Sequence, residues 1–294
     1  MSASLVQSII SGLLLGSIYA LMALGLTLIY GALRMLNLSH GALFMFGGYV
    51  AWMVTLYLGL PILIGLMVAF IVVSVIGLSL HPLIIKPLLR SPAWEMTTII
   101  ATLGISIVFE NLALLTFGPR RKTVPPILSG QMTIYGGVVV TYHEIVVAVV
   151  AVASLVIMGA FLRRSRHGLA VLAVAQNQDA AYLMGVSVYR IFALVLAVSS
   201  GLAALGGGLL ASFYFLSPTV GGTPQLKALL VTIFGGLGSV KGTVYAAYIV
   251  GLMEALVSLY VGGKWALPFL FVFMILVLIV RPSGLFGLSE EVRL

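Results

Sequence analysis

Residues 5–30 read LVQSIISGLLLGSIYALMALGLTLIY, a stretch that contains no charged side chain. An α-helix needs about 20 apolar residues to cross the hydrocarbon core of a bilayer, so this stretch predicts a membrane-spanning helix. The rest of the chain has the same character: 62% of its 294 residues are hydrophobic and only 7% are charged, whereas soluble domains average about 45–50% and about 25%. The sequence therefore predicts an all-α, polytopic integral membrane protein with a single transmembrane domain over residues 1–294.

Nine stretches have the composition of a membrane span, namely residues 5–30, 38–58, 62–80, 97–117, 145–162, 191–213, 226–237, 243–261 and 266–280. The stretch 226–237 is short and ends among glycines, so we expect eight or nine transmembrane helices. If all nine cross and the N-terminus lies outside, the inside loops hold ten Lys and Arg residues. The outside loops hold five, namely Arg120, Arg121, Lys122, Lys227 and Lys264. Because cytoplasmic loops carry the excess of Lys and Arg, we expect a cytoplasmic C-terminus.

Two loops between the spans carry structural signals. The outside loop, residues 118–144, contains an alternating stretch at 132–142 around two glycines, which is typical of a short β-hairpin. The inside loop, residues 163–190, opens with three arginines and continues through 170–184 with residues that favour a helix, which ends before Gly185. This helix suits either a groove in another protein or the surface of the lipid bilayer.

Polar residues within the predicted spans are candidates for a pathway through the membrane. Glu110 and Glu254 fall inside spans, where a charge costs about 2.5–3.5 kcal/mol on insertion scales and is a functional candidate. Asn37, Ser39 and His40 lie among glycines at the edge of a span, which indicates a broken helix facing a cavity. The alternative for all five is a hydrogen-bonded role in helix packing.

A weak internal repeat is visible in the order of these features. A glycine-rich span, a broken polar segment and a further span occupy residues 5–58, and a similar order recurs over 195–262. The two copies enter the membrane from opposite sides in the expected topology. This arrangement indicates a possible inverted repeat, which many transporters have.

The composition excludes several kinds of chemistry. The chain has no cysteine, which excludes thiolate metal sites and thiol nucleophiles, and its only aspartate is Asp179. Residues 235–243 read GGLGSVKGT, which lacks the Ser or Thr after the lysine of a phosphate-binding loop. We therefore expect no enzyme, no metal site and no cofactor, and the loop location of the basic residues argues against nucleic acid. Transport energy must come from an ion gradient or from a separate ATPase, and the inside loop favours the ATPase.

Five stretches carry a resemblance to a known family: GLLLGSIYALMALGLTLIYG (12–31), RMLNLSHG (34–41), AVAQNQDAAYLMGVSVYR (173–190), FGGLGSVKG (234–242) and RPSGLFG (281–287). They occur in order along essentially the whole chain, and they resemble the LivH-type permeases of branched-chain amino acid ABC importers. In such relatives a glutamine often stands where this chain has Glu110, so the resemblance implies no shared role for that charge.

The resemblance implies a single permease domain in a bacterial inner membrane, surrounded by lipid and without a cofactor of its own. Its partners would be a LivM-type second permease, two cytoplasmic ABC ATPases that bind the ATP, and a periplasmic binding protein. Branched-chain amino acids are the expected solutes, and relatives also import urea or short amides. The alternative is a carrier that works alone on an ion gradient.

The resemblance also implies that residues 175–185 act as the coupling helix, seated in a groove of one ATPase. The candidate coupling residues are Ala175, Gln176, Asn177, Asp179, Ala180, Ala181, Met184 and Gly185. The candidate pathway residues remain Asn37, Ser39, His40, Glu110 and Glu254.

Overall fold

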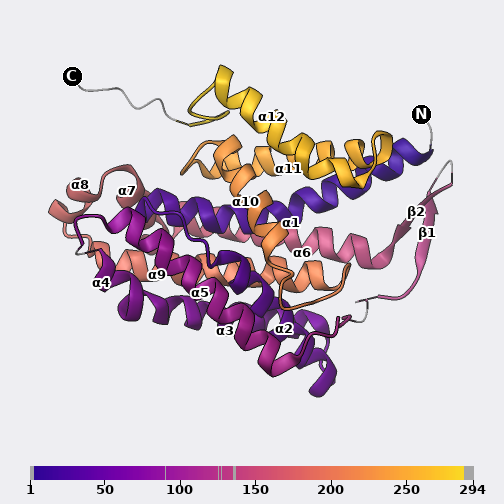
Figure 1. Cartoon of the computed structure of the whole chain (residues 1–294), viewed down its shortest axis with the longest axis horizontal. Coiled ribbons are helices and arrows are strands. Elements are labelled where there is room, and N and C mark those ends of the chain that lie inside the picture. Colours follow the sequence, from indigo (N-terminus) through magenta and orange to yellow (C-terminus); the bar gives the residue numbers. More distant parts are fainter. Residues whose placement is uncertain (1–2, 90, 125, 127, 135–136, 288–294) are drawn as a thin grey trace.

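A computed structural model describes all of the chain except residues 1–2, 90, 125, 127, 135–136 and 288–294 (Figure 1). Its elements in chain order are α1 (Ala3–Leu33), α2 (His40–Tyr57), α3 (Ile62–Leu80), a π-helical turn (His81–Ile85), α4 (Lys86–Leu88), α5 (Trp94–Phe117), β1 (Gln131–Ile134), β2 (Val138–Thr141), α6 (Tyr142–Arg164), α7 (Arg166–Gln176), α8 (Gln178–Leu183), α9 (Val188–Ala211), α10 (Gly222–Gly235), α11 (Val240–Tyr260), a 3₁₀ turn (Gly263–Trp265) and α12 (Ala266–Val280).

The long helices run between two ends of the molecule, as Figure 1 shows. The N-terminal end of α1 and the β1–β2 hairpin lie at one end, which we call the hairpin end. The helices α4, α7 and α8 lie at the opposite end, which we call the α8 end. The hairpin pairs β1 and β2 antiparallel, with Gln131 opposite Thr141 and Ile134 opposite Val138, so the expected short hairpin is confirmed.

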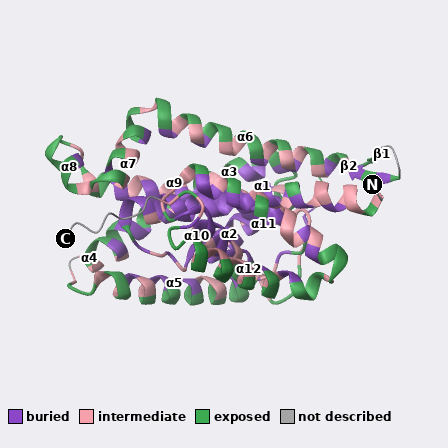
Figure 2. Ribbon diagram, turned by 90° about the horizontal axis from the view of Figure 1, so that it is seen from above, coloured by how far each residue is buried: buried purple, intermediate pink, exposed green. Residues whose placement is uncertain are grey.

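The helices α1 and α9 form the centre of the bundle, and most of their residues are buried (Figure 2). α1 packs against α11, and α3 packs against α9. Glycines permit the close approach of α1 and α11, because a Cβ built on Gly12 would lie 2.9 Å from the Cα of Leu252 and one on Gly16 would lie 2.9 Å from the Cα of Tyr248. Small residues at four-residue spacing therefore serve as helix contacts in this bundle.

The helices α5, α6 and α12 lie at the perimeter and expose apolar side chains along their length (Figure 2). Val156 and Ile157 on α6 and Ile279 and Val280 on α12 are each at least 65% exposed. Such faces suit lipid or a partner subunit, because a soluble monomer rarely exposes apolar patches of this extent. The chain is a multi-pass membrane protein, with seven helices in its described part that are long and apolar enough to cross a bilayer.

Two helices expected to span the membrane do not meet that requirement, and both begin inside the molecule. α2 starts at His40, whose ring contacts Met22 in the middle of α1. α10 starts beside it, since a Cβ on Gly41 would lie 2.6 Å from the carbonyl oxygen of Gly221. The 14 residues of α10 extend only about 21 Å, and the His, Gly and Tyr residues of α2 lower its hydropathy. Of the nine expected spans, seven are long and apolar enough to cross a bilayer, and α2 and α10 are not.

Candidate functional site

Asn37, Ser39 and His40 lie together at the junction where α2 and α10 begin. The side-chain oxygen of Asn37 accepts hydrogen bonds from the backbone N–H of Ser39 (3.0 Å) and from its hydroxyl (2.7 Å). Gln225 on the first turn of α10 donates to the Asn37 carbonyl at 3.2 Å. All three predicted residues are buried. They join the starts of α2 and α10 at the centre of the bundle.

The His40 ring fills a space that only a glycine leaves open. Its Nε2 lies 3.0 Å from the carbonyl oxygen of Met22, which requires the proton on Nε2. A Cβ on Gly25 would lie 2.7 Å from Cε1 of this ring and 3.0 Å from the carbonyl oxygen of Ser199. The other ring nitrogen, Nδ1, is buried without a hydrogen-bond partner among the described residues. His40 thus ties the start of α2 to α1 beside α9.

Glu254 belongs to a separate polar cluster at the crossing of α1, α10 and α11. Its carboxylate accepts from the ammonium of Lys227 at 2.6 Å and from the hydroxyl of Tyr19 at 3.0 Å, and Lys227 also donates to Tyr19 at 2.9 Å. The sequence-based assignment of Lys227 to an outside loop was wrong, because Lys227 lies within α10. Burial and then the Glu254 carboxylate raise the pKa of Tyr214, in the connection after α9.

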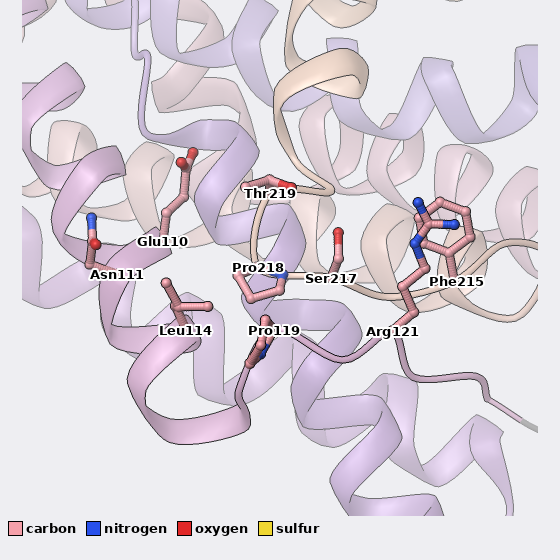
Figure 3. A pocket seen from close by; sticks show the side chains of 9 residues that line it. All are labelled: Glu110, Asn111, Leu114, Pro119, Arg121, Phe215, Ser217, Pro218 and Thr219. Carbon is pink, nitrogen blue, oxygen red and sulfur yellow. The ribbon is translucent and has the colours of Figure 1, made fainter.

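Glu110 lines a pocket near the hairpin end of α5 (Figure 3). The pocket has a volume of about 390 Å³. It is also lined by Asn111 and Leu114 of α5, by Pro119 and Arg121, and by Phe215, Ser217, Pro218 and Thr219 of the α9–α10 connection. The hydroxyl of Ser106 donates to the Glu110 carboxylate at 3.3 Å. Arg121 stacks on the ring of Phe215, with its guanidinium carbon 3.8 Å from the ring centroid. No hydrogen bond or ion pair in the described part of the chain joins Glu110 to the Glu254 cluster or to the α2–α10 junction.

The predicted coupling helix consists of two helices. The expected continuous helix over 170–184 is interrupted at Asn177, whose φ of −155° and ψ of 111° are extended. The Asn177 side chain then caps α8 by accepting from the N–H of Ala180 at 2.9 Å. α8 ends at Leu183, and Gly185, two residues further on, has a φ of +85°, while the N–H of Val186 donates to the Ala181 carbonyl at 3.0 Å. This is the helix ending expected from the glycine.

The coupling candidates divide between the surface and the interior. Gln176, Asn177, Asp179, Ala180, Met184 and Gly185 are exposed, whereas Ala181 is buried in its own chain and Ala175 is half-buried. Ala175 faces α1, because a Cβ on Gly31 would lie 3.6 Å from its Cβ. Sequence reasoning missed Tyr182 and Leu183, whose side chains are 69% and 82% exposed. The sequence signal that could have identified them is their pair of large apolar side chains directly after a polar segment.

The α8 end brings together several of the stretches that carry the family resemblance. The side chain of Gln178 donates to the carbonyl of Ala32, in the last turn of α1, at 2.7 Å. The N–H groups of Leu285 and Phe286 donate to the carbonyls of Phe234 and Gly235 at the end of α10, at 2.9 and 3.2 Å. The Gln178 hydrogen bond thus ties α8 to the end of α1, and the residues after α12 hold the end of α10.

Within the residues that the structure describes, no group of three His, Asp or Glu side chains is placed to hold a metal ion. A second pocket, of about 500 Å³, lies behind α8 and is lined by Gln178, Tyr182 and residues of α1, α5 and α9.

Comparison with known proteins identifies the family. The family described as "Branched-chain amino acid transport system / permease component" matches residues 8–279. The permease protein LivH of the high-affinity branched-chain amino acid transport system of Salmonella typhimurium is 32% identical, with 97% of this chain and 96% of the relative covered. LivH of Escherichia coli K12 is 31% identical and BraD of Pseudomonas aeruginosa is 30% identical, both over the same shares. The chain therefore belongs to the family of permease components of branched-chain amino acid transport systems.

Proposed function

We propose that this permease is one of two membrane subunits of an ATP-driven importer that carries leucine, isoleucine and valine across a bacterial inner membrane. A second permease, two cytoplasmic ABC ATPases and a periplasmic binding protein complete the assembly. The full-length similarity to LivH and BraD supports the substrate class and the partners. The chain itself is a transport permease and not an enzyme, and ATP binds to the partner subunits.

The observation that supports this proposal most strongly is the structure of α7 and α8, the two helices in the predicted coupling region. α8 exposes Tyr182, Leu183 and Met184 at the far end of the molecule, and large exposed apolar side chains at one site are typical of a protein interface. The same helix is fastened to the last turn of α1 by Gln178. An ATPase that grips the exposed side of α8 therefore pulls on α1, the central helix of the bundle. These contacts favour docking to a protein over the lipid surface.

The distribution of basic residues supports an α8 end in the cytoplasm. The elements at the α8 end carry Arg34, Lys86, Arg163, Arg164, Arg166, Arg190, Lys241 and Arg281, whereas those at the hairpin end carry Arg120, Arg121, Lys122 and Lys264. Because Lys227 lies within α10, the outside loops hold one basic residue fewer than expected, and the excess of Lys and Arg on the inside is larger. By the positive-inside rule the hairpin is periplasmic and the residues after α12 are cytoplasmic.

An inverted repeat accounts for the helix contacts. α1, α2 and α3 form one unit and α9, α10 and α11 form the other, so that the α1–α11 contact corresponds to the α9–α3 contact. The short helices α2 and α10 start side by side at the centre of the bundle. Broken helices that meet at the midplane are typical of transporter gates. The junction at Asn37, Ser39 and His40 is accordingly the gate that α8 moves through α1.

The coupling role is tested with substitutions on the exposed side of α8. Ala180 is exposed and only its backbone N–H is used in the cap, so Ala180→Trp fills the docking groove without disturbing the fold. We expect the assembled importer to lose leucine transport and transport-linked ATP hydrolysis while the permease still inserts. Ala160→Trp, on the exposed face of α6, is the matched control and keeps transport. Unchanged transport by the Ala180 variant would refute the coupling role.

The alternative of a carrier driven by an ion gradient finds little support in the geometry. Glu254, one of its two candidate acids, is paired with Lys227 at 2.6 Å. A carboxylate compensated in this way is poorly suited to take up a coupling proton or sodium ion. Liposomes that hold the permease without ATPases separate the two mechanisms, because only a carrier would accumulate leucine there when a pH or sodium gradient is imposed.

A further inference from the structure

The pocket beside Glu110 has a composition that coupling to an ATPase does not explain. Its volume of about 390 Å³ falls in the range of about 300–1,000 Å³ that is typical of small-molecule sites. Its lining combines a carboxylate, a guanidinium, two hydroxyl groups and apolar side chains. It lies at the hairpin end, about 10 Å from the end of α5, because Glu110 precedes Phe117 by seven residues at 1.5 Å each.

The two acidic residues within the membrane spans, Glu110 and Glu254, differ in whether a cationic side chain neutralises their charge. Glu254 accepts from an ammonium and a phenol. In contrast, Glu110 accepts one side-chain hydrogen bond among the described residues, from the Ser106 hydroxyl at 3.3 Å. The nearest basic residue in the pocket lining, Arg121, is engaged with the Phe215 ring. Glu110 is therefore a carboxylate without a cation partner on the wall of a pocket.

The face of α5 that carries Glu110 is unsuited to contact with lipid. Glu110 is half-buried and Asn111 is exposed, with its amide donating back to the Ile107 carbonyl at 2.8 Å. Acids within membrane spans face the bundle interior or a water-filled cavity and mark substrate or ion pathways. Because α5 is a perimeter helix, this face meets water or the second permease in the assembled importer.

From these observations we infer that the pocket is an outer binding site for the transported amino acid, in which Glu110 binds the protonated amino group. The inference rests on the proposed import of amino acids and adds a substrate site to it. The hydroxyls of Ser217 and Thr219 supply further acceptors, and Leu114 and Pro218 supply an apolar wall for the side chain. Arg121 lies across the pocket from Glu110 (Figure 3) and gives it a positive rim that attracts the carboxylate. Opposite charges on the two sides orient a zwitterion as it enters.

Transport by the complete importer in proteoliposomes tests the site. Glu110→Gln keeps the shape of the side chain but removes its charge, and hydrogen bonds to charged groups are stronger than neutral ones. We expect the maximal rate of leucine import to fall about tenfold. The leucine concentration at half-maximal rate stays unchanged, because the binding protein sets it. Glu95→Gln, an exposed acid at the other end of α5, keeps the wild-type rate. Equal rates for the two variants would overturn the inference.

A labelling experiment examines the pocket directly. The chain contains no cysteine, so Ser217→Cys creates a single reactive thiol in the permease. We expect leucine-loaded binding protein to slow the reaction of this thiol with a thiol reagent in the assembled importer. The protection disappears when Glu110→Gln is added. Protection that persists without the carboxylate, or no protection at all, overturns the assignment of Glu110. If the wild-type importer moves no branched-chain amino acid, the proposed function itself fails.

Discussion

The ammonium nitrogen of Lys227 on α10 lies 2.6 Å from the Glu254 carboxylate on α11, and both groups bond to the hydroxyl of Tyr19 on α1. This cluster neutralises two charges within the bundle and links one half-length helix to two long ones. Both side chains are only 13–14% exposed. Removal of either charge leaves the other poorly solvated, whereas removal of both does not.

Lys227→Met is expected to destabilise the permease by about 3 kcal/mol, because it leaves the Glu254 carboxylate without its cation. Glu254→Gln alone strands the ammonium and has a similar effect. The double variant Lys227→Met with Glu254→Gln restores neutrality and keeps an acceptor for Tyr19, so it should be more stable than either single variant. The unfolding midpoint in detergent measures this, with exposed Lys264→Met as the control. A double variant as unstable as the two losses combined would contradict the coupling.

Gly25→Ala is expected to destabilise the junction at the start of α2, although alanine favours helices. The added Cβ would lie 2.7 Å from the His40 ring and 3.0 Å from the Ser199 carbonyl. Overpacking costs about 1–3 kcal/mol, and loss of the His40–Met22 bond adds about 1 kcal/mol. The gain in helix propensity is only about 1 kcal/mol.

Two comparisons isolate this steric cause. A Cβ on Gly104 of α5 meets no atom within 4 Å, so Gly104→Ala should raise the unfolding midpoint or leave it unchanged. In a His40→Ala background the ring is absent, so Gly25→Ala should cost much less. If Gly25→Ala is equally harmful with and without the ring, then His40 is not the residue it displaces.

Individual residues show which parts of the fold and of the candidate site could be predicted from sequence patterns. The β-hairpin and the end of α8 before Gly185 depend on local backbone preferences, so both were predicted correctly. The starts of α2 and α10 inside the bundle depend on contacts between distant residues, such as Gln225 with Asn37, which hydropathy does not reveal. For the same reason Lys227 was assigned to a loop: its partner Glu254 is brought close only by the packing of α10 against α11. The polar residues within the spans were identified as candidate pathway residues, but the residues that they contact were not predicted.

Gln178→Met is expected to uncouple ATP hydrolysis from transport in the proposed importer. It removes the 2.7 Å hydrogen bond that ties α8 to the last turn of α1, and a loss of about 1 kcal/mol changes an equilibrium about fivefold. Leucine import should fall about fivefold while the ATPases continue to turn over, so that the number of molecules imported per ATP drops. Gln131→Met, at an exposed position of β1 at the hairpin end, should leave this ratio unchanged. A parallel fall of import and hydrolysis would point to failed docking instead.

A chain that ends at Arg281 is expected to be less stable than one that ends at Gly287. The longer chain keeps the N–H groups of Leu285 and Phe286, which bond to the last carbonyls of α10, and it keeps the Phe286 ring stacked on Tyr245 at a centroid distance of 5.4 Å. Two hydrogen bonds at about 1 kcal/mol each and one aromatic pair at about 0.5–1.5 kcal/mol predict a loss of about 3 kcal/mol. Because α10 also carries Gln225 and Lys227, the shorter chain should loosen the junction and the ion-pair cluster together. The unfolding midpoints of the two truncated chains in detergent test this, and equal midpoints would show that the segment after α12 does not hold α10 in place.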